Sequence, residues 1–131
     1  MMSRRSLVLT AACALSLAPL AASAADDVRS FSSAEFGAAQ KAGKPILVEI
    51  HAGWCPTCKA QAPVVAELRK EPRFRDLVVF RVDFDSQKEV VRQFGARQQS
   101  TLITFRGAAE AGRSVGDTSK SSIGALLAKA L

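Results

Sequence analysis

The sequence contains few cysteines, which limits what can hold its fold together. Three cysteines occur in 131 residues, namely Cys13, Cys55 and Cys58. Scaffolds stabilised by disulfides need several separated pairs. A bridge between Cys55 and Cys58 would close a loop so small that it adds little stability through chain entropy. The fold must therefore depend on a hydrophobic core, and this pair is available for chemistry.

The sequence also lacks an uninterrupted apolar run of the roughly 20 residues that a membrane-spanning helix needs. The best candidate, Leu7–Leu20, is interrupted by Pro19. This run follows two arginines and precedes an Ala-x-Ala cleavage pattern at residues 22–24. We interpret residues 1–24 as a secretory signal peptide, with a membrane anchor as the less favoured alternative. We expect residues 25–131 to form one domain, in the periplasm and without Cys13.

Basic residues are not concentrated in one uncompensated stripe. The net charge is +6, but the densest basic group, within residues 69–75, is interleaved with acidic residues. Nucleic-acid binding needs an uncompensated basic surface with aromatic or motif support, so we do not expect a nucleic-acid partner. The sequence contains no nicotinamide or flavin fingerprint either, so the chain is not expected to supply its own reducing power.

Apolar spacing and capping patterns predict the helices. Residues 32–35 have the pattern of a capping box, and the helix that they open is expected to end at Gly43. A second capping box at residues 86–89 is expected to open a helix that Gly95 ends. Helical spacing also covers residues 60–70, where Pro63 is expected to cause a kink, and residues 123–131.

Apolar runs between these helices predict the strands. They cover residues 46–50, 77–84, 101–105 and 113–115, with a further short strand near Val28. The last two strands are expected to form a hairpin whose turn holds Gly107 and Gly112. Alternation followed by a hairpin predicts an α/β fold, with a mixed sheet of four to five strands between about four helices.

The two cysteines stand where a helix is predicted to begin. Free N–H groups and the positive end of the helix dipole stabilise a thiolate at such a position, so Cys55 is the predicted nucleophile. Cys58 lies one turn further and can attack a mixed disulfide on Cys55. Two alternatives remain: a structural disulfide, or a metal site to which His51 contributes a third ligand and which would suit copper.

The segment around the cysteines resembles the active site of the thioredoxin family. A buried strand is followed by Ala52-Gly53-Trp54-Cys55 and then Cys58-Lys59, and Pro63 and Gly116 match further family positions. The resemblance covers residues 28–131. It implies the thioredoxin fold, a thiol-disulfide oxidoreductase activity on protein thiols and disulfides, and no cofactor beyond the Cys55–Cys58 disulfide.

The resemblance also assigns a role to Glu49. The family usually keeps a buried acid at this position, which helps to move the proton of the second cysteine, and a basic neighbour at the position of Arg81. Burial in an apolar strand disfavours the charged form of an acid, which suits proton transfer. A purely structural pairing of Glu49 with Arg81 or Lys59 is the alternative.

Ser100 departs from the family pattern. The segment from Ser100 and Thr101 onward resembles the one that begins with the family's cis-proline. A cis bond before a residue other than proline costs about 3 to 4 kcal/mol, which favours a trans Gln99–Ser100 bond. A serine at this position is also expected to bring a hydroxyl near the thiols. Pro56 and Thr57, between the cysteines, are expected to tune the thiolate.

These features predict a periplasmic enzyme that reduces disulfides of exported proteins. Its electrons are expected from a membrane-bound donor, and we expect a monomer. Supporting residues around the substrate groove are Trp54, Pro56, Thr57, Lys59, Arg81, Ser100 and Thr101. A copper-binding chaperone and a non-catalytic adaptor of the same fold are the alternatives.

Overall fold

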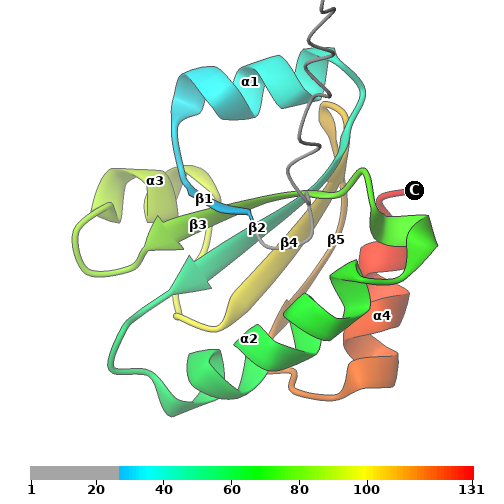
Figure 1. Cartoon of the computed structure of the whole chain (residues 1–131). Coiled ribbons are helices and arrows are strands. Elements are labelled where there is room, and N and C mark those ends of the chain that lie inside the picture. The colour runs from blue at the N-terminus through cyan, green and yellow to red at the C-terminus, as the bar shows by residue number, and fades with distance from the viewer. Residues whose placement is uncertain (1–26) are drawn as a thin grey trace, which may run out of the picture.

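A five-stranded mixed sheet organises residues 27–131, the part of the chain that the computed structural model describes (Figure 1). The predicted signal peptide lies outside the described residues. In spatial order the strands are β1 (Val28–Ser30), β3 (Val78–Asp83), β2 (Pro45–His51), β4 (Thr101–Arg106) and β5 (Ala109–Val115). The first three are parallel, whereas β4 is antiparallel to β2 and to β5. The predicted α/β fold with a mixed sheet is confirmed.

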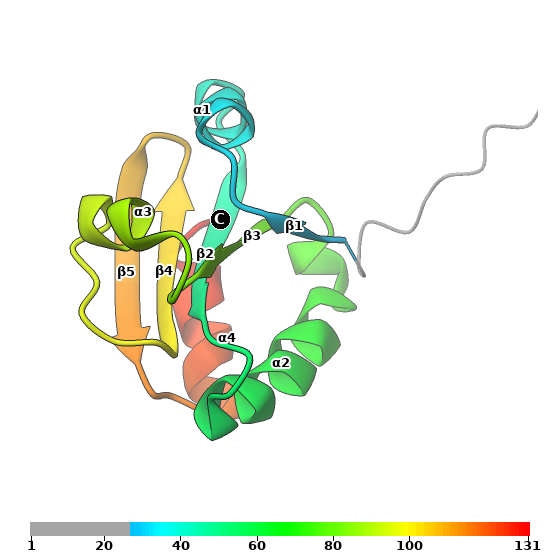
Figure 2. The same cartoon turned by 90° about the vertical axis from the view of Figure 1, so that its left-hand side faces the viewer.

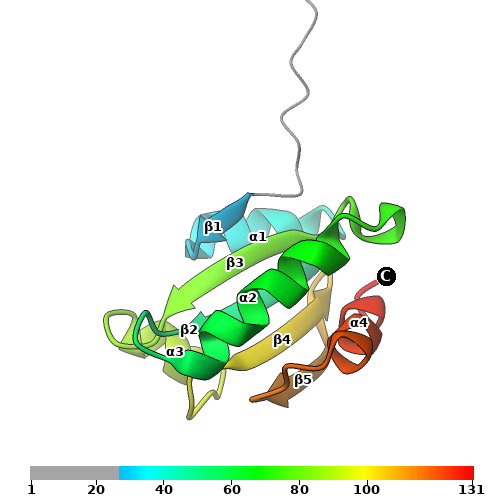
Figure 3. The same cartoon turned by 60° about the horizontal axis from the view of Figure 1, so that its bottom comes forward.

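Helices cover both faces of the sheet, as Figures 1 and 2 show. One face carries α1 (Ser33–Lys41) and α3 (Lys88–Gln93). The other carries α2 (Pro56–Arg69) and α4 (Lys120–Ala128), which lie beside each other in Figure 3. A short 3-10 helix, η2 (Pro72–Phe74), follows α2. None of the helices within residues 27–131 is long and apolar enough to cross a membrane.

Each face of the sheet has its own apolar core because side chains alternate along the strands. Leu47 of β2 points to the core beneath α2 and α4, together with Val79 of β3 and Leu102 of β4. Its neighbours Ile46 and Val48 point to the opposite core, where phenylalanines from several elements meet edge to face. The central strand β2 is therefore buried on both sides, as its β-branched run predicted.

Strand directions bring three loops to one edge of the sheet. Parallel strands β2 and β3 end side by side, with His51 opposite Asp83. Strand β4 runs the other way, so its first residue, Thr101, lies opposite Ile50 near the end of β2. The loop after β2, the loop after β3 and the loop before β4 therefore meet there, and the cysteines belong to the first of them.

Two details of the predicted elements were wrong. Strand β5 begins at Ala109, so the hairpin turn holds Gly107, with φ of 57°, while Gly112 lies inside the strand. Thr104 faces Gly112 and Phe105 faces Glu110, so Ala111 is the extra residue of a bulge. That bulge and the small residues of β5 disturb the alternation that marks a strand.

The second capping box, predicted at residues 86–89, does not form. Helix α3 begins after Gln87, with no side-chain cap. Ser86 instead donates from its hydroxyl and its amide to the Asp83 carboxylate, which also accepts from the Asp85 amide. The N-cap predicted for the first helix is confirmed, because Ser32 Oγ accepts a hydrogen bond from the Glu35 amide.

Candidate functional site

Cys55 is the N-cap residue of α2. Its backbone is extended, Pro56 occupies the first turn of the helix, and its Sγ accepts a hydrogen bond from the Cys58 amide over 3.1 Å. Proline suits this first turn because its fixed φ is helical and the missing N–H is not needed there. The sulfur thus takes the place that a serine or aspartate oxygen has in an ordinary cap. Both cysteines are free thiols.

The environment of Cys55 favours its thiolate. Burial raises the pKa of the Cys55 thiol, but hydrogen bonds from the Cys58 side chain, the Ser100 hydroxyl and the amides of Cys58 and Thr57 outweigh burial and hold it below its usual value. Each of these groups stabilises the charged form of the sulfur. The prediction that the first thiol is the acidic one therefore has a geometric basis.

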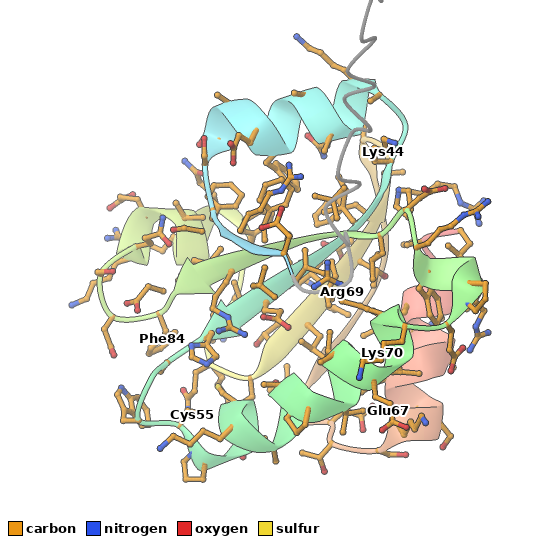
Figure 4. All side chains as sticks on the ribbon, in the orientation of Figure 1. Lys44, Cys55, Glu67, Arg69, Lys70 and Phe84 are labelled. Atoms are coloured by element: carbon orange, nitrogen blue, oxygen red, sulfur yellow. The ribbon has the colours of Figure 1, made fainter. Side chains whose placement is uncertain are left out.

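Both cysteines are almost completely buried. Cys55 is 1% exposed and Cys58 is 2% exposed. They form a small cluster with Ala52, against which Phe84 packs. Figure 4 shows Cys55 and Phe84 at the same end of the molecule, opposite the end at which Lys44 lies. This conformation therefore leaves Cys55 almost no exposed surface.

Ser100 touches both cysteines. Its Oγ lies 3.1 Å from Cys55 Sγ and 3.4 Å from Cys58 Sγ. Every peptide bond within residues 27–131 is trans, including Gln99–Ser100. The serine has a φ of 64°, in the left-handed region that residues other than glycine rarely adopt. The expected hydroxyl near the thiols is therefore present, on an unusual backbone.

A cluster of polar side chains, Glu49, His51 and Arg81, lies along the ends of β2 and β3, on the face of the sheet that α2 covers. Arg81 donates from Nε and Nη2 to Glu49 Oε2, over 3.0 and 2.9 Å. Burial lowers the pKa of His51, and the charge of Arg81 lowers it further against the opposing effects of Glu49 and Asp83. His51 is therefore mainly neutral at pH 7.

The metal interpretation is not supported by this arrangement. Within residues 27–131 no three His, Cys, Asp or Glu side chains are close enough together to hold a metal ion. His51 lies among the charges of Glu49, Arg81 and Asp83 rather than with the two thiols. The three-ligand set of Cys55, Cys58 and His51 is therefore not assembled among the described residues.

The remaining predicted residues surround the dithiol to different degrees. Trp54 is 58% exposed, and its Nε1 donates to Asp85 Oδ2 over 2.8 Å. Lys59 is exposed, and the hydrogen bonds to Glu49 come from Arg81 instead. Thr101 is buried, and its Oγ1 donates to the Gln98 carbonyl, within the loop that leads into β4.

Sequence reasoning missed Gln61. This residue is buried on α2, one turn after Cys58, and its Nε2 donates to the carbonyls of Ser100 and Asp117, over 3.1 and 2.8 Å. The signal was available: a polar residue stands at helical spacing between the buried Cys58, Val65 and Leu68. A buried amide at such a position needs hydrogen-bond partners, which marks it as structurally specific.

Comparisons with known proteins agree with this geometry. The family model described as Thioredoxin matches residues 27–129. Thioredoxin from Mycobacterium tuberculosis (strain H37Rv) is 39% identical over 80 residues, covering 61% of this chain and 68% of that protein. The chain is also 38% identical over 80 residues to a bifunctional thioredoxin reductase/thioredoxin from Mycobacterium leprae, but those residues span only 17% of that protein.

A solved structure extends the likeness to the fold. The crystal structure of Trxlp from Edwardsiella tarda EIB202 is 46% identical and superposes with a TM-score of 0.75, covering 77% of this chain and 98% of that one. The region that the family model matches, residues 27–129, contains the dithiol, the Glu49–Arg81 pair and the five-stranded sheet. The chain belongs to the thioredoxin family of thiol-disulfide oxidoreductases.

Proposed function

We propose that this protein reduces disulfide bonds of exported proteins in the periplasm, with Cys55 as the nucleophile and Cys58 as the resolving thiol. The observation that carries the proposal is the set of hydrogen bonds that hold the pKa of Cys55 below its usual value at the start of α2. A thiolate, not a thiol, attacks a disulfide, so the sulfur that ionises more readily is the one that starts the exchange.

The exchange proceeds in two displacements. The Cys55 thiolate attacks one sulfur of the partner disulfide, and the other partner sulfur leaves as a thiolate that takes a proton from water. Cys58 then loses its proton and attacks Cys55 Sγ, which forms the Cys55–Cys58 disulfide and releases the second partner sulfur as a thiolate. Two electrons have moved from the protein to its partner.

We assign the proton of Cys58 to Glu49. The acid is 6% exposed and lies on the face of β2 that α2 covers, beneath the helix that carries Cys58. An acid that is positioned to accept a proton typically contributes 10²- to 10⁴-fold to a rate. Glu49→Gln should therefore slow the resolving step at least tenfold, and the mixed disulfide on Cys55 should accumulate. An unchanged resolution rate would leave Glu49 with a structural role only.

The periplasmic location rests on residues 1–24, whose arginines, apolar run and Ala-x-Ala pattern are those of a signal peptide. A reductase outside the cytoplasm needs an electron source, and we propose a membrane-bound donor. Fusing residues 1–24 to a reporter enzyme that is active only after export tests the location. An inactive fusion with the reporter retained inside the cell would remove this part of the proposal.

Reduction of insulin by the protein in the presence of dithiothreitol tests the activity. The protein should accelerate precipitation of the insulin B chain, whereas Cys55→Ser should abolish the acceleration. Cys58→Ser should instead trap a mixed disulfide with the substrate, because the attacking thiol remains but the resolving thiol does not. If the unaltered protein fails to accelerate insulin reduction, the proposal of a general disulfide reductase is wrong.

A further inference from the structure

We propose that Ser100 is a further catalytic residue of this site, beside Cys55, Cys58 and Glu49: its hydroxyl donates a hydrogen bond to the Cys55 thiolate and so sets both the acidity of the thiol and the redox equilibrium of the pair. The inference deepens the proposed function, because it rests on Cys55 being the reacting sulfur. It is founded on the contacts of one buried side chain, which is 4% exposed and reaches both sulfurs.

The direction of the hydrogen bond between Ser100 and Cys55 follows from the charge on the sulfur. A thiolate accepts hydrogen bonds and cannot donate one, so the hydroxyl proton must point to Cys55 Sγ at 3.1 Å. The single S–H proton of Cys58 also donates to Cys55 Sγ, and Ser100 Oγ lies 3.4 Å from Cys58 Sγ. In the reduced site the Ser100 hydroxyl and the Cys58 thiol are thus both donors to one thiolate.

The backbone of Ser100 is fixed from three sides, which holds the hydroxyl in place. Its amide donates to the Ile50 carbonyl over 2.8 Å. Its carbonyl accepts from the Gly116 amide over 3.0 Å and from Gln61 Nε2 over 3.1 Å. These bonds offset the cost of the left-handed backbone at this serine. Gln61 is therefore a positioning residue, which acts on the sulfurs through Ser100.

Proline could not replace this serine without losing the arrangement. Its ring fixes φ near −65° and removes the backbone donor. Ser100 has a φ of 64° and uses its amide to bond Ile50. The family's usual proline and the serine of this chain therefore require different backbone conformations of the loop. Only the serine brings a donor to the thiols.

The hydroxyl favours the reduced form of the protein. Its bond to Cys55 is charge-assisted while the sulfur is a thiolate, and the sulfur of a disulfide carries no such charge. Because the bond stabilises one side of the redox equilibrium, its removal should shift the equilibrium with glutathione toward the Cys55–Cys58 disulfide by roughly tenfold. That factor corresponds to about 30 mV for this two-electron couple, toward a more reducing protein.

The acidity of Cys55 should change in the same variants. The other influences on its pKa are burial, the Cys58 side chain and the amides of Cys58 and Thr57, and none of them is removed with the hydroxyl. The polar cluster of Glu49, His51 and Arg81 on β2 and β3 is also unchanged in these variants. We expect the thiolate titration of Cys55 to move up by about one pH unit without Ser100 Oγ, in line with the roughly tenfold effect.

Two substitutions separate the hydroxyl from the backbone. Ser100→Ala removes the hydroxyl and keeps the cost of the left-handed backbone, whereas Ser100→Gly removes the hydroxyl and lowers that cost. Ser114→Ala is the matched control, because Ser114 Oγ is buried and has no hydrogen-bond partner within residues 27–131. Gln61→Met removes the positioning amide at similar volume. Ultraviolet absorbance of the thiolate against pH, and equilibration with glutathione, are measured for each protein.

Both Ser100 variants should show the upward titration shift and the tenfold change in equilibrium, Gln61→Met a smaller change of the same sign, and Ser114→Ala none. Wild-type values in both Ser100 variants would overturn the proposal, and so would a change in Ser100→Ala that is absent from Ser100→Gly. These readouts need no protein substrate. A failure of insulin reduction would therefore refute the proposed function while leaving the role of Ser100 separately measurable.

Discussion

Replacing Arg81 with methionine should expose the energetic cost of the acid beneath the dithiol. Arg81 makes two charge-assisted hydrogen bonds to Glu49 Oε2, of 3.0 and 2.9 Å. Within residues 27–131 these are the hydrogen bonds that the Glu49 side chain receives. Arg81→Met keeps most of the aliphatic stem and removes the guanidinium, so a carboxylate that is 6% exposed loses its counter-charge.

The magnitude follows from the exposure of the two partners. Removing one member of a fully buried ion pair destabilises a protein by about 3–5 kcal/mol, because the remaining charge is left without compensation. The Arg81 side chain is 34% exposed, so water can enter the space that the guanidinium leaves. We therefore expect a loss of about 2 kcal/mol in the free energy of unfolding, below the range for a fully buried pair.

Urea unfolding of the oxidised protein at pH 7 measures this loss without a contribution from the thiolate. Adding Glu49→Gln to Arg81→Met removes the uncompensated charge, and the double variant should recover to within about 1 kcal/mol of the wild type. If Arg81→Met unfolds within 0.5 kcal/mol of the wild type, roughly the size of an ordinary surface substitution, the pair does not stabilise the buried acid. A double variant as unstable as Arg81→Met would also refute the reasoning.

Three further predictions concern stability and substrate binding. Because the pKa of Cys55 is lowered by folding, the stability that its thiolate gives the reduced protein should be lost as pH falls through that lowered pKa; denaturation of reduced wild type against Cys55→Ser over a pH series checks the sign. Trp54→Ala should raise the KM for insulin severalfold but lower the unfolding free energy by less than about 1 kcal/mol, since the ring is exposed. Asp85→Asn, the control that keeps the ring, should leave the KM nearly unchanged. Gly107→Ala should lower the unfolding free energy by about 2 kcal/mol, because φ is 57° and a Cβ would come within 3.3 Å of backbone atoms; the same change at the exposed Gly53 should cost less, and equal losses would contradict this account.

The elements that the sequence predicted well are those whose signals are local. The β-branched run at residues 46–50 corresponds to β2, Pro45–His51, because a strand buried on both faces is mostly apolar, here with Glu49 as the exception. The edge strand β5 was predicted too short because its first half, from Ala109 to Gly112, has low strand propensity. Its hydrogen bonds to β4 form through the backbone, and backbone pairing leaves little trace in the side-chain pattern.

The site divides in the same way. Cys55 and Cys58 were predicted from their position at the start of a helix, and the pairing of Glu49 with Arg81 from the family resemblance. The register of β2 and β3 places Glu49 and Arg81 opposite each other. The roles of Gln61 and Ser86 do not follow from the sequence, because each depends on which of several polar partners lies nearest in space. Asp83 takes the hydroxyl of Ser86 that would otherwise cap α3, and no local pattern records that competition.

Cys55, the proposed nucleophile, combines two opposing requirements, and their balance gives the proposed hydrogen bond from Ser100 its effect. Burial to 1% exposure protects Cys55 but penalises its thiolate, so every donor that reaches the sulfur has to offset that penalty. The amides of Thr57 and Cys58 belong to the start of α2, and the same geometry is available to any cysteine that caps a helix. The hydroxyl of Ser100 comes instead from the start of β4, through a loop that Gln61 and Ile50 hold at a positive φ. Residue 100 is therefore the position at which the fold can change the acidity of the thiol without altering the helix that carries it.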